Sequence, residues 1–210
     1  MNFHHIRCLL FDLDDTLYSQ NCGAWDMIRK RINSFMIEEL KFRPEIVPTL
    51  RHRLWTQYGT TLRGLQTEYT VDMDTFLDYV HDIPLEEVLQ HNPTLVDLLQ
   101  NLPQRKVIFT NANADHANRV LDLLGINQFF EDIIDIYAIS PHCKPEIEAF
   151  EKMLSLIDED PINCLLIDDS PGNLTAASSL GMATVSVGNR RHDGSLHIES
   201  ILQLDTVLKG

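Results

Sequence analysis

Residues 8–16, which read CLLFDLDDT, indicate the fold more clearly than any other stretch of the chain. The apolar run Cys8–Phe11 is short and continuous, and it ends abruptly in a segment with three aspartates. This pattern predicts a buried parallel strand with carboxylates at its C-terminal end. Asp12 and Asp14 are separated by one residue, so in an extended segment their side chains point in the same direction.

The C-terminal half of the chain alternates between apolar runs and amphipathic stretches. Strands are expected at 106–109, 133–137, 164–167 and 183–187, and helices at 114–124, 145–156 and 171–180. Gly125 and Gly181 follow two of these helices, where glycine commonly ends a helix. Alternation at this spacing predicts an α/β fold with a Rossmann-like, doubly wound parallel sheet.

The segment between the first strand and this alternating part is expected to be helical throughout. Apolar residues recur at spacings of three and four from Trp25 to Leu40, and Pro48 and Pro93 stand where they can open helices. No strand pattern interrupts the segment. We therefore predict a catalytic core of residues 1–20 and 103–210, with an all-helical domain inserted at 21–102.

Acidic side chains gather at the ends of two predicted strands. Asp168 and Asp169 stand at the end of one predicted strand, and Asp12 and Asp14 follow another. Ligands of open α/β sheets bind beyond the carboxyl ends of the strands. Clustered carboxylates repel one another unless a cation relieves them, and oxygen ligands favour Mg²⁺ where phosphate is present. An aspartate can also act as a covalent nucleophile for phosphoryl groups, and a neighbouring aspartate as a general acid and base.

Three further residues are candidates for binding phosphate. Thr110 and Asn111 lie between a strand and a helix, where hydroxyl, amide and backbone N–H groups can hold phosphate oxygens. Lys144 stands at the start of a helix and offers a compact positive charge. Positioning and charge neutralisation are most of what phosphoryl transfer requires of a protein.

Composition limits the classes of partner. The 210 residues carry a net charge of −14, which argues against binding to nucleic-acid polymers or anionic membranes. An acidic protein can bind an anionic substrate only if a cation lies in its site.

The four cysteines show no pairing pattern and no apolar leader precedes residue 8, so we expect reduced thiols in a cytoplasmic protein. The oligomeric state is left open.

In this order, the residues resemble the four motifs of the haloacid dehalogenase (HAD) superfamily. The first motif, DxDxT, is similar to residues 12–16, and the second, a Thr that ends a strand, to Thr110. The third, a Lys, is similar to Lys144, and the fourth, an acidic pair with a downstream Asn, to residues 168–173. The helical insert is similar to the cap domain of this superfamily, so the resemblance covers the whole chain.

The resemblance implies a role for each motif residue. Asp12 would be the nucleophile and a Mg²⁺ ligand, and Asp14 the general acid and base, with its backbone carbonyl also on the metal. Asp168 would be a direct metal ligand, and Asp169 a ligand either directly or through water. Thr110 and Lys144 would hold the phosphoryl group, while Asn111 and Asn173 shape the site.

The same resemblance narrows the substrate to a small phosphorylated metabolite. Dehalogenases lack the second aspartate, so Asp14 favours a phosphatase or a phosphomutase. Residues 12–18 and 58–65 are similar to the pyrimidine 5′-nucleotidase subfamily, which implies a pyrimidine nucleoside 5′-monophosphate as substrate. Tyr58 would then stack on the base and Arg63 meet a polar group, although packing of Tyr58 and solvation of Arg63 fit equally well. A sugar-phosphate phosphatase, a phosphomutase and a non-catalytic regulatory protein remain alternatives.

Overall fold

The computed structural model describes residues 3–189 and 191–208, which form two compact units. The first unit consists of the described residues within Met1–Cys22 and Leu89–Gly210, and the second of Gly23–Val88. Among the described residues, no helix combines the length and the apolar character needed to cross a membrane.

The first unit is built on a parallel sheet. Its six strands lie in the order β3-β2-β1-β4-β5-β6, and every neighbouring pair is parallel. The strands are β1 (Cys8–Phe11), β2 (Arg105–Phe109), β3 (Asp132–Ile134), β4 (Cys164–Asp168), β5 (Ala183–Val187) and β6 (Leu196–Ile198). The chain extends the sheet from β1 toward β3 and then returns to the other side of β1 with β4, so the strand order reverses beside β1. This is the doubly wound parallel α/β sheet that the sequence predicts.

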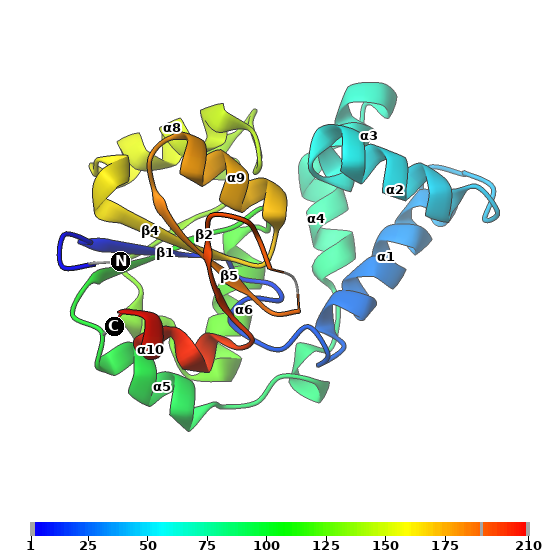
Figure 1. Ribbon diagram of the computed structural model, residues 1–210. Coiled ribbons are helices and arrows are strands. Elements are labelled where there is room, and N and C mark those ends of the chain that lie inside the picture. The colour runs from blue at the N-terminus through cyan, green and yellow to red at the C-terminus, as the bar shows by residue number, and fades with distance from the viewer. Residues whose placement is uncertain (1–2, 190, 209–210) are drawn as a thin grey trace. The chain divides into compact units, whose positions relative to one another are not determined.

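Helices cover both faces of the sheet (Figure 1): α8 and α9 lie on one face, and α5, α6 and α10 on the other. The helices of this unit are α5 (Pro93–Gln100), α6 (Ala114–Leu124), α7 (Ile136–Ile139), α8 (Ile147–Ile157), α9 (Pro171–Ser179) and α10 (Leu204–Leu208). Three-residue 3₁₀ turns lie at Asn127–Phe129, Pro161–Asn163 and Ile201–Gln203.

The core of the first unit follows the two-residue period of its strands. Cys8 and Leu10 of β1 belong to an apolar cluster with Phe109 of β2 and Phe150 of α8. The intervening Leu9 and Phe11 are equally buried, and Phe11 packs edge-on against Phe130. Burial on both faces explains why the central strands read as continuous apolar runs.

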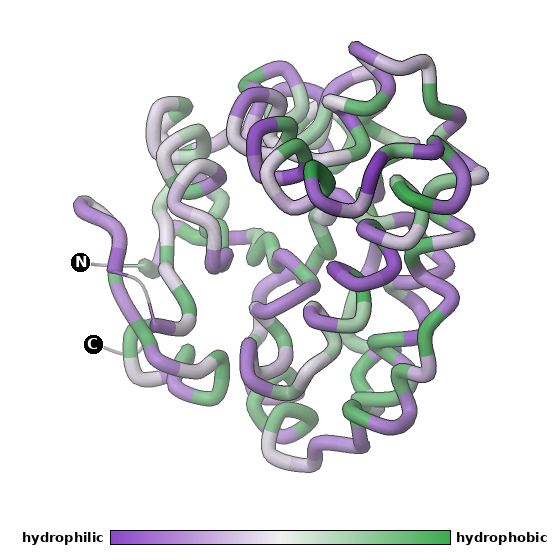
Figure 2. Tube along the Cα trace, turned by 90° about the vertical axis from the view of Figure 1, so that its right-hand side faces the viewer, coloured by the Kyte–Doolittle hydropathy of each residue, from purple (hydrophilic) through white to green (hydrophobic). Residues whose placement is uncertain are grey.

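The second unit contains only helices among its regular elements. They are α1 (Ala24–Glu38), α2 (Val47–Tyr58), α3 (Thr61–Tyr69), α4 (Met73–His81) and a 3₁₀ turn at Leu85–Glu87. Along the helices, the tube in Figure 2 alternates between green and purple, as expected for helices with one apolar face. In α1 the buried Phe35 packs edge-on against Phe76 and Tyr79 of α4.

The sequence-based assignment is wrong in one strand and incomplete elsewhere. The strand expected at 133–137 ends at Ile134, because Asp135 caps α7 by accepting a hydrogen bond from the backbone N–H of Ala138 at 2.9 Å. The sequence also places 93–100 in the helical insert, whereas α5 falls in the first compact unit. The predicted division at 20/21 and 102/103 thus differs from the boundaries of the compact units. The strand β6 and the helix α10 are not anticipated.

Candidate active site

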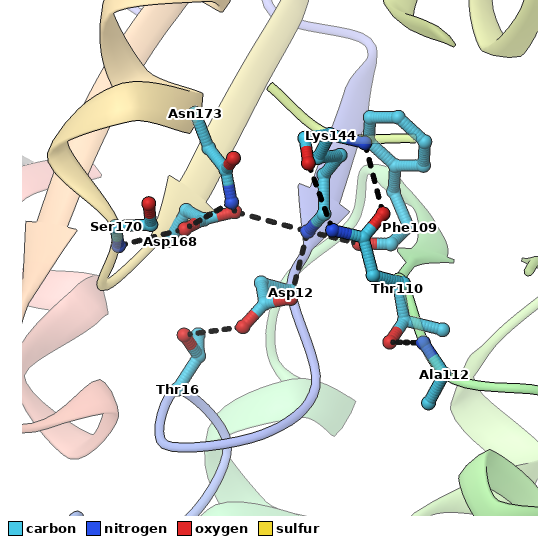
Figure 3. Close-up of polar contacts among 10 residues, drawn as sticks. Asp12, Thr16, Phe109, Thr110, Ala112, Lys144, Asp168, Ser170 and Asn173 are labelled. Atoms are coloured by element: carbon cyan, nitrogen blue, oxygen red, sulfur yellow. Dashed lines mark hydrogen bonds and ion pairs between the residues drawn. The ribbon is translucent and has the colours of Figure 1, made fainter. Parts of the chain in front are cut away.

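Asp12 follows β1 at the carboxyl end of the sheet. Its backbone N–H donates to the carbonyl oxygen of Ile167 at 2.9 Å, which ties this position to β4. Its side chain is buried and accepts two hydrogen bonds (Figure 3), from Lys144 Nζ to Oδ1 at 2.7 Å and from Thr16 Oγ1 to Oδ2 at 3.1 Å. The two donors fix the orientation of the carboxylate.

Lys144 is a buried cation in this site. Read alone, a lysine in this segment would be expected at the surface, yet only 1% of Lys144 is exposed. Its Nζ donates to Asp12 Oδ1, to the carbonyl oxygen of Phe109 at 2.6 Å and to Asp168 Oδ2 at 3.1 Å (Figure 3). These acceptors match the three N–H groups of an ammonium. Burial lowers the pKa of Lys144, but the carboxylates of Asp12 and Asp168 outweigh burial and raise it well above its ordinary value.

Asp168 ends β4 and is fully buried. Its Oδ1 accepts from the backbone N–H of Ser170 at 2.8 Å and from Asn173 Nδ2 at 3.0 Å. Both donors belong to the segment that starts α9. Because Phe11 and Ile167 are partners in the β1–β4 pairing, the residues that follow them, Asp12 and Asp168, lie at the same edge of the sheet.

Asp12, Asp168 and Asp169 form an acidic cluster in which one carboxylate oxygen from each residue lies within 4.8 Å of the others. Burial, followed by the neighbouring carboxylates, raises the pKa of Asp169 to about 8. Burial, together with Asp168 and Asp14 and against the attraction of Lys144, raises the pKa of Asp12 to about 7. One lysine does not balance three carboxylates, and an all-oxygen donor set suits a hard divalent cation such as Mg²⁺. The residues present therefore fit the metal that the sequence suggests.

Asp14 lies on the turn that follows β1. Its Oδ1 contacts two side chains, the hydroxyl of Tyr18 at 2.6 Å and Nε2 of His116 at 2.9 Å. Its carboxylate is partly exposed, with 16% of the side-chain surface accessible, whereas the His116 side chain is fully buried. Asp14 is thus accessible to solvent on one side and held by the protein on the other.

Thr110 and Asn111 follow β2 at the same edge. The Thr110 hydroxyl oxygen accepts from the backbone N–H of Ala112 at 3.0 Å (Figure 3). The Asn111 amide binds the backbone of Lys144 on both sides, donating to its carbonyl oxygen at 3.0 Å and accepting from its N–H at 2.9 Å. The side chain of Asn111 therefore joins two loops of the site, and its contact with phosphate stays a prediction.

The structure brings all the predicted site residues to one end of the sheet, and it adds four residues to which the sequence analysis gives no role in the core site. Thr16 and Tyr18 stand four residues after Asp12 and Asp14. A hydrogen bond from Leu17 N to the Leu13 carbonyl oxygen at 3.1 Å closes the turn between them. Their i, i+4 spacing is a signal that the sequence contains. Gln20, whose Nε2 donates to Asp169 Oδ2 at 3.1 Å, and His116 have no such signal.

A family profile described as haloacid dehalogenase-like hydrolase matches residues 6–181. The chain belongs to this family. It is 29% identical over 197 residues to Phosphate metabolism protein 8 of Saccharomyces cerevisiae, with 85% of this chain and 60% of that protein covered. The chain thus spans less than two thirds of the yeast protein. It is 24% identical over 185 residues to the pyrophosphatase PpaX of Bacillus cereus, with 87% and 83% covered.

Solved structures show the same fold. The HAD-hydrolase YfnB of Bacillus subtilis, solved bound to magnesium, superposes with a TM-score of 0.67 at 20% identity, and 98% of this chain and 99% of that chain are covered. At this identity the likeness concerns the fold. In this chain, the parallel pairing of β1 and β4 places the acidic ends of these two strands side by side.

Proposed function

We propose that this HAD hydrolase is a magnesium-dependent phosphomonoesterase that forms an aspartyl-phosphate intermediate on Asp12. The observation that carries the proposal is the Asp12 carboxylate, held by Thr16 and Lys144 at the carboxyl end of β1. The names of the yeast and Bacillus cereus relatives, a phosphate-metabolism protein and a pyrophosphatase, support phosphoryl chemistry.

In the first step, a carboxylate oxygen of Asp12 attacks the phosphorus atom of the substrate. A bond forms between Asp12 and phosphorus while the bond from phosphorus to the leaving oxygen breaks. Asp14 gives its proton to that leaving oxygen, so that a neutral alcohol departs. Thr16 and Lys144 keep the attacking carboxylate in one orientation, which reduces the entropy lost on reaching the transition state.

In the second step, Asp14 is ionised and takes a proton from a water molecule. The oxygen of that water attacks phosphorus, the bond from phosphorus to Asp12 breaks, and inorganic phosphate leaves. Both aspartates then return to their starting states. Asp14 suits both roles because its carboxylate is partly exposed while its other contacts fix its position.

Asp12, Asp168 and Asp169 would hold the Mg²⁺ ion, together with the backbone carbonyl of Asp14. When bound, the ion neutralises negative charge shared between the carboxylates and the phosphoryl oxygens. This resolves the difficulty that a protein of net charge −14 must bind an anion.

Magnesium should change how stability depends on pH. Without metal, the folded pKa values of Asp12 and Asp169, about 7 and about 8, lie above the ordinary value of 3.8. The folded state then binds more protons than the unfolded state between these limits, so the free energy of unfolding falls as pH rises. Urea unfolding in EDTA should therefore show lower stability at pH 8 than at pH 6, and saturating Mg²⁺ should remove most of the difference. Equal stability at both pH values in EDTA would contradict this.

For the substrate we propose a small phosphorylated metabolite, with pyrimidine nucleoside 5′-monophosphates first. The segment that resembles the nucleotidases ends α2 and starts α3, where Thr60 caps α3 by accepting from the backbone N–H of Arg63. Gly64 allows the two helices to approach, since a Cβ there would lie 2.7 Å from Leu54 Cβ. The Tyr58 hydroxyl donates to Glu68 at 3.0 Å, so part of this segment serves the packing of the helical unit. Arg63 is the residue whose role in selection a substrate panel can test.

The panel should contain p-nitrophenyl phosphate, pyrimidine and purine nucleoside monophosphates, sugar phosphates and inorganic pyrophosphate. We expect phosphate release that requires Mg²⁺ and stops in EDTA, with the highest kcat/KM for the pyrimidine nucleotides. Arg63→Met should lower kcat/KM for these nucleotides about tenfold relative to p-nitrophenyl phosphate. Arg29→Met, which removes an exposed arginine of the same unit, is the matched control.

Other rankings would revise the proposal in defined ways. No preference for pyrimidine nucleotides over sugar phosphates would exclude the nucleotidase while retaining the phosphatase. Isomerised sugar phosphate without free phosphate would identify a phosphomutase. Absence of magnesium-dependent turnover on every member of the panel would contradict the phosphatase itself.

A further inference from the structure

We propose that Tyr18 and His116 are positioning residues that hold one oxygen of Asp14, so that its other oxygen, Oδ2, carries the proton to the leaving group. The inference rests on the proposed function and extends it to two side chains that lie outside the four superfamily motifs. It follows from the geometry around Asp14, where both side chains converge on the same atom, Oδ1, at 2.6 Å from the Tyr18 hydroxyl and 2.9 Å from His116 Nε2.

Both partners are buried side chains. Tyr18 is buried and directly follows the hydrogen-bonded turn Leu13–Leu17, four residues after Asp14. His116 lies in the first turn of α6, and its backbone N–H donates to the side chain of Asn113, which caps the helix, at 3.1 Å. Asp135 accepts from Ala114 N at 3.0 Å and so ties the start of α6 to the end of β3. The position of His116 is therefore set by the sheet and by a helix cap, and not by an exposed loop.

The convergence on Oδ1 distinguishes the two oxygens of Asp14. A carboxylate oxygen has two lone pairs, and two donors occupy both on Oδ1. An ionised carboxylate only accepts hydrogen bonds, so the imidazole must carry its proton on Nε2 to make this contact. When Asp14 is protonated, its proton is then carried on Oδ2, which can transfer it to a leaving oxygen. Loss of either donor would let the proton reside on Oδ1 or let the carboxylate rotate away.

The test uses the leaving group of the substrate, because a merely structural defect would not depend on it. An alkyl phosphate releases an alkoxide that needs a proton, whereas p-nitrophenolate leaves without one. The ratio kcat/KM reports the first irreversible step, which includes cleavage of the bond to the leaving group. The variants are Tyr18→Phe, His116→Leu and His116→Gln, assayed with p-nitrophenyl phosphate and with the best alkyl phosphate of the wild-type protein.

We expect Tyr18→Phe and His116→Leu to lower kcat/KM for the alkyl phosphate by about 10- to 100-fold, as for removal of other supporting hydrogen bonds in active sites. For p-nitrophenyl phosphate the loss should stay below about threefold, because Asp12 attacks without need of the acid. His116→Gln should recover part of the alkyl phosphate activity, since its amide N–H can reach Oδ1. Tyr79→Phe is the matched control, because the Tyr79 hydroxyl donates to Glu38 at 2.6 Å in the helical unit. Tyr79→Phe should leave kcat/KM unchanged for both the alkyl phosphate and p-nitrophenyl phosphate.

Two results would overturn the inference, and they are distinguishable. In the first result, the wild-type protein releases phosphate with Mg²⁺, but Tyr18→Phe and His116→Gln lower kcat/KM for both substrates by the same factor or leave both values unchanged. The proposed positioning of Asp14 is then wrong, while the proposed phosphatase activity is retained. If the wild-type protein releases no phosphate from either substrate, the proposed function fails and the inference fails with it. Tyr18→Phe removes a single oxygen atom, so the test does not depend on whether His116→Leu folds.

Discussion

Asp12→Asn should reduce phosphate release by about four orders of magnitude or more, as expected when the nucleophile of a covalent mechanism is removed. An amide oxygen does not attack phosphorus, and the substitution also removes one of three carboxylates in the acidic cluster. The shape of the side chain is unchanged, and an amide oxygen can still accept from Lys144. Removal of a carboxylate from a crowded acidic site relieves repulsion. We therefore expect the free energy of unfolding in EDTA to stay within about 2 kcal/mol of wild type.

The activity of Asp12→Asn should be compared with that of a control variant in which an aspartate outside the site is replaced, and both variants must be shown to be folded. Asp115 is exposed in the first turn of α6, and Asp115→Asn should retain wild-type activity. Phosphate release and urea unfolding measured on the same preparations separate chemistry from folding. A folded Asp12→Asn protein with more than a tenth of wild-type kcat would contradict nucleophilic catalysis by Asp12.

Lys144→Met should abolish activity and destabilise the protein by about 3–5 kcal/mol in EDTA. The substitution leaves two buried carboxylates, Asp12 and Asp168, without the ammonium that both accept from. Part of the loss should be recovered in Mg²⁺, because a cation bound to the folded state stabilises it by mass action. The measurement is urea unfolding with EDTA and with saturating Mg²⁺, together with phosphate release.

Lys106 offers an unusual control for this experiment. It is also buried, but its Nζ donates to the carbonyl oxygens of Leu102 and Gln104 at 2.6 and 3.0 Å, with no carboxylate among these partners. Lys106→Met should cost about 1–3 kcal/mol, should not be rescued by Mg²⁺, and should leave the rate of phosphate release unchanged. Equal losses for the two lysines, with no effect of Mg²⁺, would show that Lys144 acts only as a packed side chain.

The sequence predicts most of the first unit because its signals are strong and local. The apolar run Cys8–Phe11 becomes β1, and the helix expected at 114–124 becomes α6, with Gly125 in a left-handed conformation after it. The error at 133–137 arises because the aspartate inside the apolar run is a helix cap and not an exposed strand residue. The strand β6 is not predicted because its three residues are too few to show the alternation of apolar and polar side chains that indicates a strand. Helix α5 has the same amphipathic pattern as the helices before it, so no local signal assigns it to a unit.

In the candidate site, too, the sequence predicts the features that have local signals and misses those that depend on the tertiary fold. The carboxyl ends of parallel strands share one edge of a sheet, so the sequence predicts that Asp12, Thr110 and Asp168 lie close together. The burial of Lys144 and its three acceptors cannot, because they depend on the path of the chain between β3 and α8. His116 is 102 residues from Asp14, and only the tertiary fold brings the two side chains together.

The covalent mechanism is tested most directly by isolating the intermediate. The protein is mixed with the best substrate and Mg²⁺, quenched in acid within one turnover, digested, and examined by mass spectrometry for a phosphoryl group on the peptide containing Asp12. We expect an acid-stable, base-labile phosphoryl group on Asp12, absent in EDTA and in Asp12→Asn. Rapid phosphate release without phosphorylation of Asp12, or with the phosphoryl group on another residue, would contradict the assignment of Asp12 as the nucleophile.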